Sequence, residues 1–150
     1  RRSVYTFWKR TAPPPSLMAF DAPSRETCVA RRARTNTPLQ ALVLMNDEQY
    51  VEAARNLAAR ILQQPGDTSA RLAWAFRLCT GRSPESAELE VLAHNHQQQL
   101  EHFAGSPAEA EKLLAIGLSP RQTDAAAAEF AAMTMTANLL LNLDETITRE

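Results

Sequence analysis

The fold is decided by the stretch Thr37–Ile61, TPLQALVLMNDEQYVEAARNLAARI. Thr37 followed by Pro38 is typical of a helix start, because a threonine side chain caps free amides and proline fits the first helical turn. Apolar residues then recur every three or four positions, which indicates helices with one face toward a core. These residues are Leu39, Leu42, Val43, Tyr50, Ala54, Leu57 and Ile61.

Start and stop signals divide the chain from residue 37 onward into helices. Asn46-Asp47 interrupts the apolar pattern, so we expect one helix to Met45 and a second over Glu48–Gln63. Capping, proline and glycine signals predict further helices over residues 68–80, 83–103, 106–117 and 123–142. Short links between amphipathic helices imply an all-α, antiparallel bundle of about five helices, forming one domain over residues 37–150.

The first 36 residues have a different pattern and are expected to form an irregular arm. Pro13-Pro14-Pro15 predicts a stiff spacer, because proline fixes φ and removes backbone donors. Four aromatic residues lie in the arm, namely Tyr5, Phe7, Trp8 and Phe20. Since aromatic side chains lose much free energy by staying in water, we expect the arm to dock on the bundle.

Charge divides the chain at the same place. Residues 1–36 carry eight Lys or Arg and two acids, a net charge of +6, whereas residues 37–150 carry eight and fifteen, a net charge of −7. A basic arm on an acidic bundle either packs against its own acidic helices or attracts an anionic partner. No predicted helix carries the basic face that reads bases, so nucleic-acid binding is not expected. No apolar stretch approaches the roughly 20 residues of a membrane span.

The cysteines and histidines form no recognisable reactive pattern. Cys28 and Cys79 match neither a metal nor a redox motif, so we expect two buried apolar residues, with a disulfide as the alternative. His94 and His96 point to different sides of one helix, and no metal site or cofactor is predicted in this stretch. His96 lies on an apolar stripe and is expected to be a hydrogen-bonded core residue.

The densest polar cluster surrounds the start of the helix at Pro38. Its arginine and amide members suit carboxylate, sulfate or phosphate binding beside a helix N-terminus; they are Arg25, Arg31, Arg34, Asn36 and Gln40. Asp21 and Glu26 are the candidate acid–base groups. The alternative is structural: the two acids pair with the arginines, and Asn36 bonds to backbone, so that the cluster pins the arm to the bundle.

Several motifs resemble a known family. They are Arg1–Arg10 (RRSVYTFWKR), Pro13–Ser16 (PPPS), Phe20–Glu26 (FDAPSRE), Arg34–Leu42 (RTNTPLQAL), Leu44–Asp47 (LMND), Gly81–Pro84 (GRSP) and Asn138–Glu145 (NLLLNLDE). Together they resemble the planctomycete-type domain of unknown function 1553, over nearly the whole chain. The resemblance implies the C-terminal part of that domain, in large exported bacterial proteins that carry a cytochrome c-like haem module and other domains upstream.

Two interpretations of function follow. The favoured one is a structural or interaction module without catalysis of its own, which closes the C-terminus of a multidomain protein and docks on its upstream domains. The alternative is part of an enzyme or redox-associated site for an anionic, carboxylated or sulfated carbohydrate. In that case Asp21 or Glu26 acts as base, Arg34 holds the anion and Asn36 orients the substrate.

Overall fold

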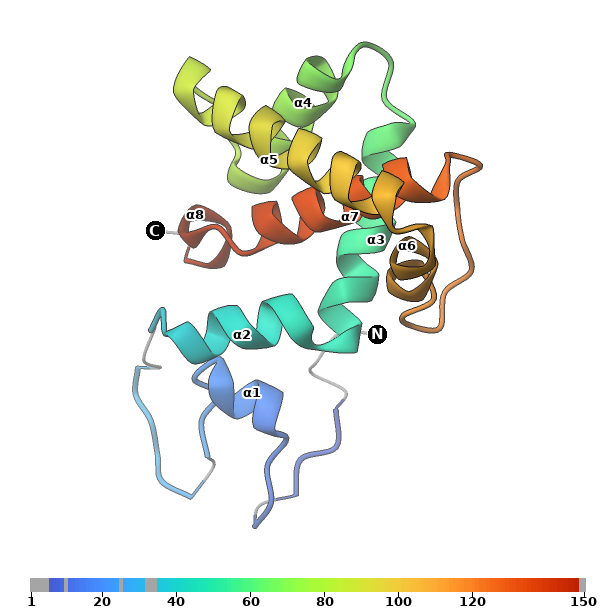
Figure 1. Cartoon of the computed structure of the whole chain (residues 1–150). Coiled ribbons are helices and arrows are strands. Elements are labelled where there is room, and N and C mark those ends of the chain that lie inside the picture. The colour runs from blue at the N-terminus through green and yellow to red at the C-terminus, as the bar shows by residue number, and fades with distance from the viewer. Residues whose placement is uncertain (1–5, 10, 25, 32–34, 149–150) are drawn as a thin grey trace.

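The computed structural model describes residues 6–9, 11–24, 26–31 and 35–148 and is all-α. In chain order the helices are α1 (Pro15–Ala19), α2 (Pro38–Asn46), α3 (Glu48–Leu62), α4 (Thr68–Thr80), α5 (Ser86–Gly105), α6 (Pro107–Leu114), α7 (Ala127–Leu141) and α8 (Asp144–Ile147) (Figure 1). The only β pairing in the described residues is the isolated bridge between Lys9 and Ala12, before α1. The predicted all-α bundle is confirmed.

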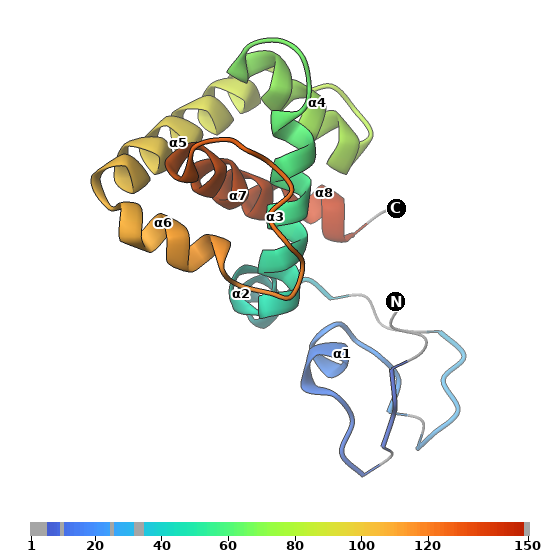
Figure 2. The same cartoon turned by 90° about the vertical axis from the view of Figure 1, so that its right-hand side faces the viewer.

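Helix α7 forms the centre of the bundle. Its sequence, AAEFAAMTMTANLLL, has Glu129 as its only charged residue and is otherwise mostly apolar or small, and such a helix is stable in water only when other elements enclose it. Helices α3, α5 and α6 supply that enclosure (Figure 2). Phe130, Met133 and Leu140 are almost completely buried, and Ala131 and Ala137 let the surrounding helices approach closely.

The predicted break between α2 and α3 is confirmed. The Thr37 hydroxyl accepts the Gln40 amide while the Gln40 side chain accepts the Thr37 amide, so that both ends of a capping box are made. Asp47 then ends α2 and caps α3 by accepting the amide of Gln49 at 2.9 Å. One residue therefore separates the two helices and allows the chain to turn.

The limits of the later helices are partly as predicted. Asp67 caps α4, and Gly81 ends it with a φ of 86°, in the left-handed region. Helix α5, predicted from Ser83-Pro84, begins instead at Ser86, because Glu85 and Glu88 form the capping box. Helix α6 starts at Pro107 without a side-chain cap and ends at Leu114, and α7 starts later than predicted, at Ala127.

Three expectations about individual residues are wrong. Leu39 and Leu42 were predicted to face the core, but both are exposed, since α2 buries Gln40 and Leu44 instead. Cys28 is exposed rather than buried, because it lies in the irregular part of the arm. Cys28 and the buried Cys79 are not joined to each other, so the alternative of a disulfide is also wrong.

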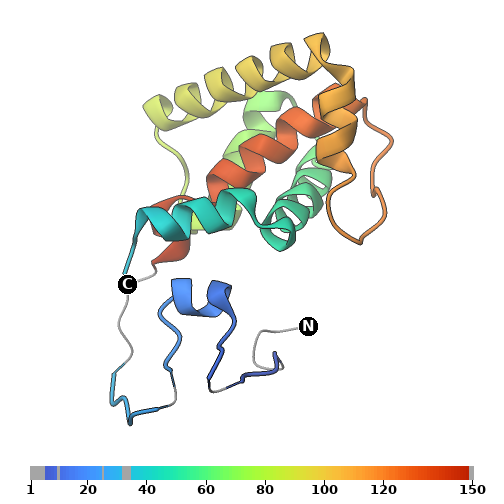
Figure 3. The ribbon, with the colours of Figure 1, turned by 60° about the horizontal axis from the view of Figure 1, so that its bottom comes forward.

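The arm is attached below α2, on the side away from α5 (Figure 3). A short helix, α1, begins at Pro15, where the sequence predicted a spacer; proline is well suited to the first position of a helix. Phe20, just after α1, meets Tyr50 of α3 with ring centroids 5.8 Å apart. Phe20 therefore docks the arm on the bundle as expected, whereas Phe7 is 83% exposed and does not dock.

Candidate functional site

The cluster predicted around the start of α2 is centred on Asp21. This half-buried residue follows α1 and has a φ of 56°, a conformation that aspartate tolerates better than most residues. Its Oδ2 accepts the backbone amide of Thr35 at 2.8 Å and the Thr35 hydroxyl at 2.7 Å. The carboxylate thus holds the segment that leads into α2 against the end of α1.

Gln40 continues this contact into the bundle. Its side chain is buried, and Nε2 donates to Thr35 Oγ1 at 3.1 Å and to Asp21 Oδ2 at 3.5 Å. The same amide group accepts from Thr37 in the capping box. All the polar atoms of this side chain are therefore used to shape the start of α2 and to hold the arm there.

Asn36 links the arm to the other end of the chain. Its Nδ2 donates to Asp144 Oδ1, at the start of α8, at 2.6 Å. Asp144 also accepts from the Thr148 hydroxyl at 2.8 Å. Asn36 thus bonds to a side chain 108 positions away, where the structural interpretation expected a backbone partner.

The remaining predicted residues are not brought into this group of contacts. Glu26 and Arg31 are exposed, and neither makes an ion pair within the described part of the chain. Arg25 and Arg34 lie outside the described residues. The structure therefore brings together Asp21 and Gln40 through Thr35, and places Asn36 on a separate contact to α8.

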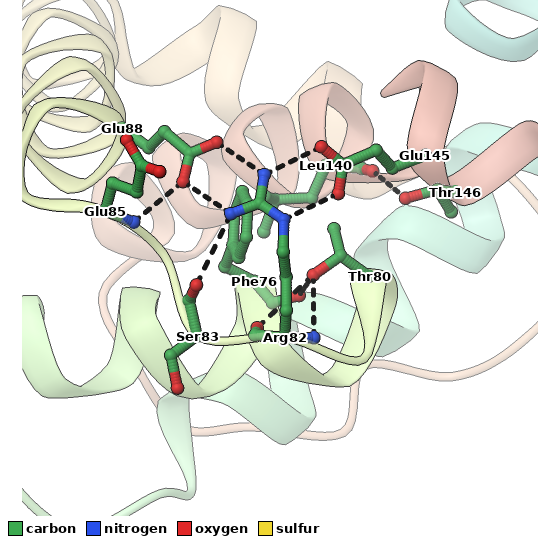
Figure 4. A network of polar contacts seen from close by, with 9 residues as sticks. All are labelled: Phe76, Thr80, Arg82, Ser83, Glu85, Glu88, Leu140, Glu145 and Thr146. Carbon is green, nitrogen blue, oxygen red and sulfur yellow. Dashed lines mark hydrogen bonds and ion pairs between the residues drawn. The ribbon is translucent and has the colours of Figure 1, made fainter.

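A second polar network surrounds Arg82, just after the left-handed cap of α4. Its guanidinium donates to both carboxylate oxygens of Glu88 at 2.6 and 2.8 Å, and to both of Glu145 at 2.7 and 2.9 Å (Figure 4). The ring of Phe76 lies beneath it, 4.8 Å from the guanidinium carbon. The network ties the α4–α5 turn to α8, and two bidentate pairs are the geometry in which a surface ion pair contributes most.

Charge in this network shifts proton affinities in opposite directions. Hydrogen bonds from Arg82, and then from the backbone amide of Glu85, lower the pKa of Glu88 to about 2. The two carboxylates in turn raise the pKa of Arg82, with Glu88 contributing most. Both groups are therefore charged at neutral pH, and neither is poised to exchange a proton there.

A third network holds the loop between α6 and α7. The Glu52 carboxylate of α3 accepts the amides of Leu118 at 3.1 Å and Ser119 at 2.8 Å. Buried Arg55 donates to the carbonyls of Leu114 and Ser119. Hydrogen bonding by the Ser119 hydroxyl, followed by the two amides, lowers the pKa of Glu52. The sequence did not reveal this network, because its members lie more than 55 positions apart.

His96 is a core residue, as predicted. It is buried on α5, and its Nδ1 lies 3.3 Å from Thr136 Oγ1 of α7. Because that hydroxyl donates to the carbonyl of Ala132, it accepts from His96, and the tautomer with a proton on Nδ1 fits. Burial lowers the pKa of His96, an effect that Glu129 partly offsets, so the ring is neutral in the folded protein near pH 7.

The described residues near these networks do not form the pattern of a metal site. No group of three or more His, Cys, Asp or Glu side chains in the described ranges could hold a metal ion. An open hollow of about 310 Å³ on α4 is lined by Trp74, Arg77 and Leu78, none of which belongs to the three networks. Within the same residues, no helix combines the length and apolar character needed to cross a bilayer.

Comparison with known protein families gives a match. A family model described as PSD1, Protein of unknown function (DUF1553), matches residues 1–95, which include the arm, α2, α3, α4 and the first half of α5. The motif resemblance reached further, to Glu145, than this match does. No curated protein and no solved structure matches the chain.

The Arg82 network predicts a specific pH dependence. Glu88 has a folded-state pKa below its ordinary value of 4.5, so its ion pair stabilises the fold above about pH 4.5, and this contribution is lost as the pH falls toward 2. Glu88→Gln keeps the capping hydrogen bond but removes the charge. We expect it to lower the melting temperature at pH 7, and the difference from the parent chain to shrink steadily between pH 5 and pH 2. A constant difference, or one matched by Glu90→Gln on the exposed face of α5, would contradict the assignment.

The Glu52 network predicts that replacing Gly117 by a residue with a Cβ atom destabilises the fold. Gly117 has a φ of 93°, and a Cβ atom there would lie 2.5 Å from Glu52 Oε2. We expect Gly117→Ala to lower the free energy of unfolding by about 2–4 kcal/mol, through backbone strain and overpacking. The matched control is Gly105→Ala at the end of α5, where a Cβ meets no atom within 4 Å and the change should be neutral or stabilising. If the two variants lost the same free energy of unfolding in urea, the close packing of Gly117 against Glu52 would be contradicted.

Proposed function

This chain belongs to the family of proteins of unknown function DUF1553, and we propose that it is a structural and interaction module without catalysis of its own. The supporting observation is that three described members of the predicted cluster, Asp21, Gln40 and Asn36, hold parts of this chain together. Asp21 accepts from Thr35 and Gln40, and Asn36 donates to Asp144. Carboxylate and amide groups that hydrogen-bond within their own chain stabilise its fold, which supports a structural role over a catalytic one.

The architecture supports the same proposal. The arm contacts α2 and α3 through α1 and Phe20, and it reaches α8 through Asn36. The Arg82 network fastens α8 to the α4–α5 turn. Helix α1, the segment before α2 and helix α8 are thus fixed to one bundle, an arrangement suited to a module that packs in a defined orientation against neighbouring domains.

The setting of the module is proposed from the motif resemblance. We place it at the C-terminus of a large, exported, multidomain bacterial protein, where it packs against upstream domains that include a cytochrome c-like haem module. The alternative, a site for carboxylated or sulfated carbohydrate, would need Asp21 to act as a base. Its Oδ2 already accepts two short hydrogen bonds, which stabilise the ionised form and weaken a base.

The proposal is tested by removing the carboxylate of Asp21. Asp21→Ala should lower the free energy of unfolding by about 1–2 kcal/mol and increase proteolytic cleavage within residues 6–36, since the arm loses its hydrogen bonds to Thr35. Asp21→Asn is the matched control, because asparagine keeps an acceptor oxygen and tolerates positive φ. Melting curves and limited proteolysis of the natural full-length protein would measure both.

The competing outcome is equally specific. If Asp21→Ala leaves the melting temperature and the cleavage pattern unchanged, but abolishes binding of sulfated or uronic-acid oligosaccharides that the parent protein binds, the cluster is a ligand site. The structural proposal would then be wrong.

A further inference from the structure

Helix α8 is a single turn that the hydrophobic core does not hold in place. None of its four residues is buried, Ile147 is only half-buried, and Asp144 and Glu145 at its start are exposed. A helix of this length does not persist in water by itself, because one turn fixes several backbone angles for one hydrogen bond. The position of α8 therefore depends on the contacts that its side chains make with other parts of the chain.

Two of these contacts come from adjacent residues and lead to different parts of the molecule. Glu145 accepts two hydrogen bonds from Arg82, at 2.7 and 2.9 Å, which tie α8 to the α4–α5 turn (Figure 4). Asp144 accepts a hydrogen bond from Asn36 at 2.6 Å, which ties α8 to the segment before α2. The α4–α5 turn and the arm are thus joined through neighbouring positions of one helical turn.

The place of Asn36 in the chain connects α8 to the docking of the arm. Asn36 lies between Thr35, whose amide and hydroxyl both donate to Asp21, and Thr37, which caps α2. These three consecutive residues therefore link the end of α1, the start of α2 and α8. A movement of Asp144 would remove one of the three attachments of this segment.

The single turn of α8 makes its two contacts depend on each other. The Thr148 amide donates to the carbonyl of Asp144 at 2.8 Å and so closes the turn at the residue that holds Asn36. A turn that lost its bidentate tie to Arg82 would unwind and displace the Asp144 carboxylate. The Arg82 and Glu145 side chains are 41% and 51% exposed, so dissolved salt reaches this pair and screens it.

We propose that α8 is a salt-sensitive strap that tightens the docking of the arm while the Arg82–Glu145 ion pair is closed. Opening of the pair frees α8 and then Asn36, so that the arm loosens while the bundle stays folded. The coupling is reciprocal, because two contacts that stabilise the same turn stabilise each other. This inference rests on the proposed structural role of the arm and adds a means by which the position of the arm responds to ionic strength.

Amide hydrogen exchange of the natural full-length protein tests the strap. The Thr148 amide reports on the closed turn of α8, and the Thr35 amide reports on the docked arm. Glu145→Gln should speed the exchange of both amides about three- to tenfold through local opening, and about 1 M NaCl should do the same to the parent protein. Glu88→Gln is the matched control: it weakens the other ion pair of Arg82 but lies on α5, so both amides should change less than about twofold.

A double-mutant cycle shows whether the effect passes through Asn36. Asn36→Ala alone should speed exchange at Thr148, and adding Glu145→Gln to it should not speed exchange at Thr35 any further. Three results would each overturn the strap: unchanged exchange at Thr148 in Glu145→Gln, faster exchange at Thr148 with Thr35 still protected, or equal effects of Glu145→Gln and Glu88→Gln.

Failure of the strap is distinct from failure of the structural role of the arm. If the Thr35 amide is protected in the parent protein but indifferent to Glu145→Gln, the arm is docked and only the strap is wrong. If the Thr35 amide exchanges freely in the parent protein, the docking through Asp21 is wrong, and the strap with it.

Discussion

The enclosure of α7 is the constraint on which the rest of the structure depends. The consecutive residues Ala131, Ala132 and Met133 point to different sides of the helix and are all buried, so α7 is surrounded. Helices α3, α5 and α6 each bring an apolar stripe to it, and their polar sides become the surface of the bundle. The small side chains of α7, such as Ala131 and Ala137, allow several helices to approach it at once.

The polar networks lie at the joints that this enclosure creates. Arg82 stabilises the turn that sends α5 back over α7, and Arg55 with Glu52 holds the long connection between α6 and α7. Asp21, Thr35 and Gln40 fasten the arm where α2 begins. In each case a charged or amide side chain satisfies backbone groups or partners that an irregular segment would otherwise leave without hydrogen bonds. Polar residues that resemble a reactive cluster in the sequence thus hold the loops in place.

Local signals predicted much of this architecture, and long-range contacts account for what was missed. Thr37, Asp47, Asp67 and Gly81 act within a few residues of their partners, so the sequence placed these helix ends correctly. The outward orientation of Leu39 and Leu42 was missed because the turn at Asp47 separates the face of α2 from the face of α3, and periodicity does not report such a rotation. Asn36, Arg55 and Arg82 each have a partner, Asp144, Leu114 and Glu145 respectively, that lies 59 to 108 positions away, beyond any local pattern.

Amide hydrogen exchange of the chain measures the central role of α7 most directly. If α7 is the enclosed centre, its amides between Phe130 and Leu140 exchange most slowly, only through global unfolding, while those of α1 and α2 exchange much faster through local opening. Amides of α7 that exchange as readily as those of α1 or α2 would contradict a bundle built around that helix.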